Sequence, residues 1–214
     1  MGIISLDPAV QVILIPVIIF ALSFHEFSHG WMAHRYGDPT AKNAGRLTLN
    51  PMAHLDVFGS IALYFMGFGW AKPVPVDPRY LANPKKDMMR IALAGPVSNL
   101  IVALISGILL SILLRFGLIG NQSTLVIVLI MSLQINLVLA IFNFIPIPPL
   151  DGSRILEGLV PHKYHNELVK FEYYGPRVLM GLILLSMFTR FNIFSVIISP
   201  IMTIFLKIFT FGIY

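Results

Sequence analysis

The sequence contains no cysteine and very few charged residues. Asp, Glu, Lys and Arg make up only 12% of its 214 residues, whereas 57% are hydrophobic. A soluble domain carries about 25% charged residues, so this chain has too little polar surface to coat a water-soluble globule. We therefore expect an integral membrane protein. Without cysteine, the chain can form neither a disulfide framework nor a thiolate metal site, and any zinc must be bound by histidine and carboxylate.

Several other features are missing from the sequence. It has no internal repeat, no low-complexity tract and no polar stretch long enough for a soluble accessory domain. No RNA- or DNA-binding motif interrupts the apolar runs, so the net charge of +5 needs no nucleic-acid partner. No basic residue precedes the first apolar run, and we therefore do not expect a cleavable signal peptide.

Three apolar runs are long enough to cross a bilayer. The first helix is predicted to begin at Pro8, with Asp7 as its N-cap, and to end just before Gly37. Nearly thirty residues at 1.5 Å each cover roughly 40 Å, which exceeds the ~30 Å hydrocarbon core. Residues 91–114 and 124–145 form two further uncharged runs of sufficient length.

The segment 53–70 has an apolar part shorter than the usual span of about 20 residues, and it contains three glycines. Lys and Arg flank it on both sides, so one basic cluster would lie outside the cell if the segment crossed. We therefore interpret it as a re-entrant or membrane-embedded segment that enters and leaves on the cytoplasmic side. Other protein or a wet cavity must then shield its irregular backbone.

With this assignment the basic residues gather on one side of the membrane. Residues 35–52, 68–90 and 151–177 carry twelve of the fifteen Lys and Arg residues, and we expect all three regions in the cytoplasm. The N-terminus then lies outside. Two shorter apolar arms, 178–189 and 191–206, predict a C-terminal helical hairpin that returns the chain to the cytoplasm.

The first apolar run ends with the motif His25-Glu26-Phe27-Ser28-His29. A spacing of four residues puts both imidazoles on one face of a helix, where they can share a metal ion. Glu26 can then reach a metal-activated water and take its proton as the water attacks a carbonyl. A chance match is the alternative, but a buried charge costs ~2.5–3.5 kcal/mol at the bilayer centre, so such residues are rarely found there without a function.

Two histidines leave a catalytic zinc ion one protein ligand short. Asp151 is our preferred third ligand, with Asp56 and Glu157 as the alternatives. It follows the third apolar run, where three prolines stop the helix and Gly152 permits a sharp turn. His29 and Asp151 both lie near the cytoplasmic ends of their spans, so they can meet just below the membrane surface.

With these residues in place, the sequence resembles the site-2 protease family of intramembrane zinc metalloproteases, in its short form without a PDZ or CBS domain. The matching pieces occur in the family's order and cover about residues 20–155. They are His25-Glu-Phe-Ser-His29, Gly45-Arg-Leu-Thr-Leu-Asn-Pro51 with His54-Leu-Asp56, Gly69-Trp-Ala-Lys-Pro-Val-Pro75, Ala94-Gly-Pro-Val-Ser-Asn99, and Asn143 through Gly152. The family often has Asn-Pro-Asp-Gly where this chain has Pro-Pro-Leu-Asp-Gly, and the aspartate is kept.

The resemblance implies that His25, His29 and Asp151 bind one zinc ion per chain and that Glu26 activates water. It also implies that Asn143 contacts the substrate or steadies the tetrahedral oxyanion, a role that an amide N–H₂ can perform. The residues alone leave open that Asn143 only hydrogen-bonds a neighbouring helix.

Other polar residues are given structural roles. Asn99 is expected to stabilise the interruption of the helix at Pro96, where its amide can satisfy a backbone carbonyl that the proline leaves free. A place near the active site is the second choice. His34 lies about 140° round the helix from His29 and is expected to face the cytoplasmic interface. The remaining candidates are expected to cap turns or to be solvated: His54, Asp56, His162 and His165.

The predicted fold is an all-α polytopic membrane protein, with a three-span catalytic core, the re-entrant segment and the C-terminal hairpin. We divide it into an intramembrane metalloprotease core (1–155), a cytoplasmic amphipathic connector (156–177) and a C-terminal transmembrane hairpin (178–214). Short strands are expected near 44–50 and 70–77. The resemblance implies that such an edge receives the unwound substrate by strand addition.

The predicted function is hydrolysis of peptide bonds within or near the transmembrane segments of membrane proteins, by a multi-pass protein of the cell membrane whose active site lies near the cytoplasmic side. The substrate protein and the lipid bilayer are the expected partners, and the oligomeric state is left open. A metal transporter or channel is the first rival, but it has no need for Glu26 beside a ligand and outside the ligand set. A catalytically inactive, partner-binding relative is the second, and the presence of all four chemical residues speaks against it.

Overall fold

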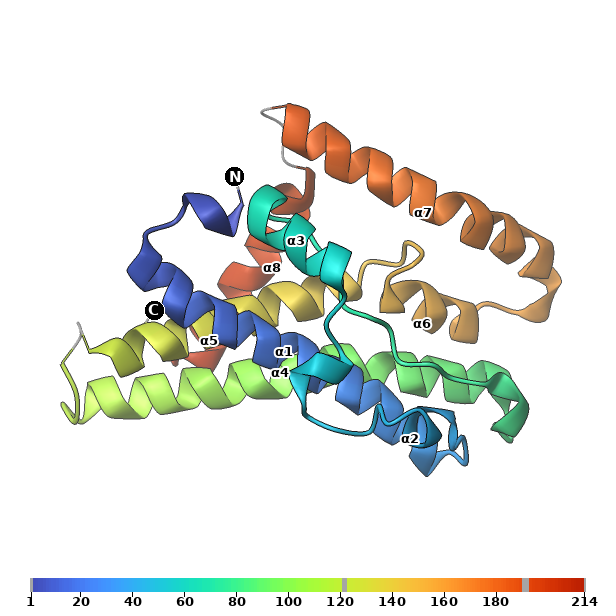
Figure 1. Cartoon of the computed structure of the whole chain (residues 1–214), viewed down its shortest axis with the longest axis horizontal. Helices are drawn as coiled ribbons and strands as arrows, with labels where there is room; N and C mark the ends of the chain where they lie inside the picture. Colours follow the sequence, from blue (N-terminus) through green and yellow to red (C-terminus); the bar gives the residue numbers. More distant parts are fainter. Residues whose placement is uncertain (1, 121–122, 190–192, 214) are drawn as a thin grey trace.

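Three long apolar helices lie side by side and form the body of the protein in this computed structural model, which describes residues 2–120, 123–189 and 193–213 (Figure 1). They are α1 (Pro8–Arg35), α4 (Pro84–Arg115) and α5 (Thr124–Asn143). All three are long and apolar enough to cross a membrane, and they match the three predicted spans. The chain is therefore a polytopic, all-α membrane protein.

Local chemistry sets the ends of these helices. Asp7 accepts a hydrogen bond from the Ala9 N–H (2.8 Å), and Pro8 occupies the first helical position of α1. The left-handed backbone of Gly37 (φ +98°) follows its other end. Helix α4 begins seven residues before the predicted apolar run, because Asn83 caps it and the polar turn that follows continues the helix.

Helix α4 is the centre of the packing and contacts α1, α5 and α6. Between α4 and α5 the buried core includes Ala103, Leu133 and Leu137, and Phe209 of α8 closes it. By contrast, only 17% of the most apolar stretch of α1 is buried within the protein. Side chains such as Val12 and Phe20 point outward from α1, as expected of a surface that faces lipid.

The segment 53–70 folds out and back. It contains the ten-residue helix α3 (Val57–Met66), which Asp56 caps by accepting from the Gly59 N–H (2.8 Å). Leu55 and Ala71 form an antiparallel bridge, and the Lys72 N–H donates to the His54 carbonyl (2.8 Å). The two ends of the segment therefore lie next to each other.

The expected strands near 44–50 and 70–77 do not form in the described residues, and this part of the prediction was wrong. Residues 72–77 are extended, but they pair with side chains and turns rather than with a neighbouring strand. The isolated bridge between Leu55 and Ala71 is the β-type pairing that the described residues contain. Prolines at 73 and 75 explain this, since each removes an N–H that a ladder would use.

The C-terminal part begins with α6 (Asp151–Leu159) and continues into α7 (His165–Phe188) and α8 (Ile193–Phe209). Helix α7 starts well before the predicted arm at 178, and the axes of α7 and α8 diverge by 91°. Residues 190–192, which include Arg190 and the predicted start of the second arm, lie outside the described residues. The proposed boundaries at 155 and 177 fall inside α6 and α7, and the division into three parts stays a prediction.

Short helices complete the described chain. They are α2 (Thr40–Asn43), η1 (Ile3–Ser5), η2 (Pro51–Ala53), η3 (Pro78–Tyr80) and η4 (His162–Tyr164).

Candidate metal centre

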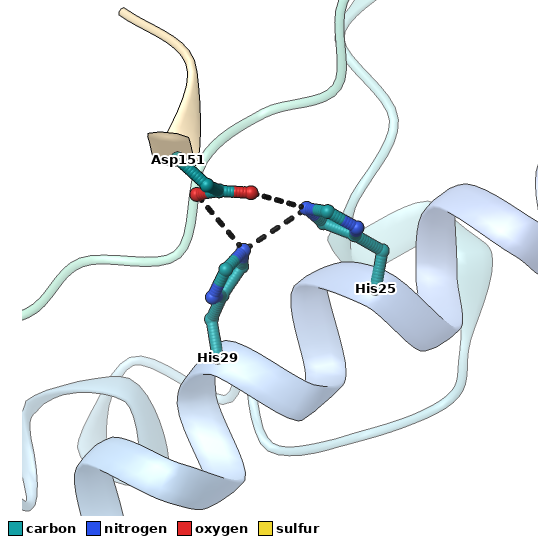
Figure 2. A group of neighbouring side chains, drawn as sticks. All are labelled: His25, His29 and Asp151. Carbon is teal, nitrogen blue, oxygen red and sulfur yellow. Dashed lines mark hydrogen bonds and ion pairs between the residues drawn. The ribbon is translucent and has the colours of Figure 1, made fainter. Parts of the chain in front are cut away.

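Three side chains converge between α1 and the start of α6 (Figure 2). His25 and His29 project from successive turns of α1, and their Nε2 atoms are 3.0 Å apart. Asp151 approaches from the opposite side, with Oδ2 at 3.1 Å from His25 Nε2 and Oδ1 at 3.3 Å from His29 Nε2. Both histidines are buried, with exposed fractions of 5% and 9%. The sequence predicted this convergence from the spacing and depth of the three residues.

Asp151 reaches the histidines because α6 begins directly against the end of α5. It is the first residue of α6, and the buried Gly152 follows it. A Cβ on Gly152 would overlap the carbonyl groups of Phe144 and Ile145, so only glycine permits this approach. The sharp turn that was expected at Gly152 is not what requires glycine there, because its φ is not positive.

The outer ring nitrogens of both histidines have partners that fix the position of the protons. His29 Nδ1 lies 2.7 Å from the Ile91 carbonyl, which can only accept, so this nitrogen must carry the proton. His25 Nδ1 lies 2.6 Å from Asn99 Oδ1. The Asn99 amide is oriented by its Nδ2, which donates to Asn136 Oδ1 (2.8 Å), so Oδ1 is left to accept from His25. In both neutral rings, Nε2 therefore presents a lone pair to the centre.

The resulting centre consists of acceptors without a donor. Two nitrogen lone pairs and a carboxylate face one another at 3.0–3.3 Å. The Asp151 carboxylate is largely buried, and no described Lys or Arg side chain pairs with it. Such an arrangement requires a cation. A tetrahedral zinc ion with bonds of about 2.0–2.1 Å holds its ligand atoms about 3.3 Å apart, which fits this triangle.

Gly95 of α4 leaves room beside these ligand atoms. A Cβ on Gly95 would overlap the Nε2 atoms of both His25 and His29. The first turn after the Ile91 carbonyl thus lies directly against the metal-binding face of α1. From the sequence, Gly95 was identified only as part of the motif Ala94–Asn99, and nothing in its spacing indicated this contact.

Glu26 lies beside the triangle and is not part of it. Its side chain is half-buried, and its Oε2 accepts a hydrogen bond from the Val74 N–H (3.0 Å). The second oxygen is left to exchange protons. A carboxylate that is next to the ligand pair and outside it is suited to act as a general base.

The two predicted asparagines have different surroundings. Asn99 is fully buried and accepts a hydrogen bond from His25. It therefore lies beside the site, which was the second-choice prediction for this residue. Asn143 is half-buried, and its Nδ2 donates to the Leu139 carbonyl one turn earlier in α5 (3.0 Å). Asn136, a polar residue in the uncharged span of α5, accepts a hydrogen bond from Asn99 of the neighbouring helix α4, as polar residues in such spans are expected to do.

The remaining polar candidates lie away from the centre. His54 is fully buried and donates from Nε2 to the Thr48 carbonyl (2.7 Å), and Asp56 caps α3, as expected of turn and capping groups. His162 and His165 are exposed. Neither Asp56 nor Glu157 joins the group of potential ligands among the described residues, which consists of His25, His29 and Asp151.

Comparisons with known proteins agree with this chemistry. The chain matches the family model of Peptidase family M50 over residues 13–124 and 111–186. It is 42% identical over 165 residues to "Putative zinc metalloprotease YwhC" of Bacillus subtilis, which covers 76% of this chain and 75% of that protein. It is 28% identical over 152 residues to "Zinc metalloprotease MJ0392" of Methanocaldococcus jannaschii, which covers 71% of this chain but 35% of that longer protein. No solved structure matches the chain significantly. The chain belongs to peptidase family M50, the site-2 protease family, and is a zinc metalloprotease of the membrane.

Proposed function

We propose that the protein hydrolyses peptide bonds within or near the transmembrane segments of other membrane proteins. One observation carries this proposal: the convergent triangle of His25, His29 and Asp151 is built on a helix that is long and apolar enough to span a bilayer. A soluble substrate would have to enter the membrane to reach it, whereas a transmembrane segment is already at that depth.

In the proposed reaction, His25, His29 and Asp151 bind one zinc ion per chain. When bound, zinc supplies Lewis-acid chemistry that activates water and polarises the scissile carbonyl. The Nδ1 hydrogen bonds of His25 and His29 keep both imidazoles turned toward the ion. Glu26 takes the proton of the attacking water and passes it to the leaving nitrogen. The role of Asn143 as an oxyanion donor stays a prediction, for which one of its two amide protons is already engaged.

The proposed setting is the cell membrane, with the active site near its cytoplasmic side. The C-terminal end of α1, the N-terminal end of α4 and helix α6 meet at one end of the bundle. The basic residues of 35–52, 68–90 and 151–177 fall in chain segments that include or adjoin these elements. Short loops with such an excess of Lys and Arg stay inside. The proposed partners are a transmembrane substrate protein and the lipid bilayer, and no nucleic acid.

The test compares wild type with Glu26→Gln, both purified with their metal and reconstituted with a single-span peptide. Glutamine is nearly isosteric with glutamate but cannot accept the proton, so we expect normal zinc content and loss of cleavage. Near-normal turnover by the variant would refute the role of Glu26 and favour a transport site. In cells, the same pair should differ in the membrane proteome, where uncut single-span stubs accumulate with Glu26→Gln.

A further inference from the structure

Arg46 is a buried arginine beside the proposed active site. It lies between α2 and η2, and its exposed fraction is 6%. Its two terminal nitrogens donate to successive backbone carbonyls of the segment 72–77, Nη1 to that of Pro73 (3.2 Å) and Nη2 to that of Lys72 (2.5 Å). An arginine is rarely buried unless it is paired, and these carbonyls are the hydrogen-bond partners of the Arg46 side chain among the described residues.

The segment that Arg46 binds also supplies the hydrogen bond to Glu26. The N–H of Val74, the residue directly after Pro73, donates to Glu26 Oε2 (3.0 Å). Pro73 and Pro75 have no N–H, so Val74 is the one donor that the chain offers at this point. The segment is tied further along as well, where the Asp77 N–H donates to the buried Asp38 (2.7 Å).

Arg46 and Glu26 also interact electrostatically across this segment. Burial lowers the pKa of Arg46, and the Glu26 carboxylate acts in the opposite direction. The guanidinium stays charged. The base therefore has a cation and a backbone donor on the same side.

We propose that Arg46 is a positioning residue for the hydrolysis. By binding two successive carbonyl oxygens, it keeps the Val74 N–H directed at Glu26, so that one carboxylate oxygen is anchored and the other exchanges the proton. This inference rests on the proposed function, in which Glu26 is the general base. The planar fork of arginine can bind both carbonyls at once, whereas the single ammonium of lysine is a point charge.

The first measurement is hydrogen exchange at the Val74 amide, which requires no catalytic activity. Few amide protons exist between Lys72 and Asp77, because Pro73 and Pro75 have none, so fragments that cover this segment report on Val74 directly. Arg46→Met should speed exchange at Val74 about tenfold or more, the effect of losing a hydrogen bond to a charged group. Glu26→Ala should do the same. Unchanged exchange in Arg46→Met would overturn the proposal.

The second measurement separates kcat from KM in the purified, zinc-loaded enzyme. Arg46→Met should lower kcat about 10- to 100-fold with little change in KM or zinc content, because only the base is misplaced. Val74→Pro should have a similar effect, since it removes the N–H at a position that Pro75 already keeps extended. Arg46→Lys should recover part of the rate. Zinc loss in proportion to activity would mean that Arg46 is merely structural and would overturn the proposal.

Two control variants match these substitutions. Arg79→Met removes an exposed arginine that is paired with Asp77 on the same stretch of chain, and Val76→Pro repeats the proline substitution two residues from Val74. Both should keep kcat within about twofold, well below the loss that misplacing the base produces. The double variant Arg46→Met/Val74→Pro should be no slower than the slower single variant, because both changes release the same hydrogen bond. Fully additive losses would contradict the proposal.

Failure of this inference is distinguishable from failure of the proposed function. If wild type cleaves the peptide and Glu26→Gln does not, normal kcat in Arg46→Met refutes the role of Arg46 alone. If wild type cleaves no transmembrane peptide, the proposed function fails, and the exchange rate of Val74 still decides whether Arg46 fixes the segment at Glu26.

Discussion

His25 donates a hydrogen bond from Nδ1 to Asn99 Oδ1 at 2.6 Å, and this contact joins the metal-binding face of α1 to the polar interior of α4 and α5. Asn99 in turn donates to Asn136, whose own Nδ2 donates to the Ser132 carbonyl (2.8 Å). Both asparagines are fully buried. This directed chain of hydrogen bonds determines which nitrogen of His25 is free to bind a metal ion.

Removing Asn99 should therefore weaken metal binding without removing a ligand. We expect Asn99→Ala to lower the zinc affinity about 10- to 100-fold, the usual cost of losing the partner of a ligating histidine. Asn136→Ala should have a smaller effect in the same direction, because Asn99 keeps its bond to His25 but loses its orientation. Competition with a chelator measures both affinities. Asn143→Ala is the control and should bind zinc normally. An equal loss of zinc affinity in all three variants would contradict the role of the hydrogen bonds that link His25, Asn99 and Asn136.

The ligand set itself predicts a simple pattern of metal content. His29→Ala and Asp151→Ala should each lose most of the zinc, because a tetrahedral site with two protein ligands is weak. His34→Ala should retain it, since His34 is not in the convergent group. Metal analysis of the purified variants checks this. Normal zinc in Asp151→Ala would remove that residue from the ligands.

The contact of Gly95 with the histidines predicts a large effect of one methyl group. In Gly95→Ala the added Cβ would overlap both Nε2 atoms, so the histidines must turn away or α4 must shift. We expect loss of most of the zinc while the protein still inserts into the membrane. Gly181→Ala is the matched control, because a Cβ on Gly181 meets nothing within 4 Å. A zinc-loaded, active Gly95→Ala enzyme would be incompatible with this geometry.

The bridge between Leu55 and Ala71 predicts that the segment 53–70 does not cross the membrane. Its two ends lie next to each other, so a cysteine at Lys42 and another at Lys85 should be labelled from the same side, which we expect to be the cytoplasm. The eight Lys and Arg residues in the two flanking loops favour that side. The native chain has no cysteine, so each engineered thiol is labelled without background. Labelling of the Lys85 position from the exterior alone would establish a spanning segment and refute this topology.

Much of the site could be predicted because the relative positions of its residues follow from their spacing along the sequence. The spacing of His25 and His29 fixes their common face, and the position of Asp151 after an apolar run fixes its depth. The close contacts could not be predicted in this way. Gly95 and Val74 meet the site only after α4 and the extended segment pack against α1, and a linear sequence carries no signal for such contacts.

The missing strands have a similar explanation. A strand near 70–77 was expected, but the N–H of Lys72 donates to the His54 carbonyl and the N–H of Val74 donates to Glu26. These N–H groups are bonded to groups elsewhere in the fold and are not available to a neighbouring strand. Local sequence propensity contains no information on such tertiary partners.

The position of Asp151 at the start of α6 has a consequence for biosynthesis. His25 and His29 leave the ribosome early, but their third partner follows only after α4 and α5 have been made. Membrane proteins insert from the N-terminus onward, so a nascent chain carries the histidine pair for most of its synthesis without the carboxylate that completes the centre. The group of His25, His29 and Asp151 is therefore complete only once the third long helix, α5, has been made.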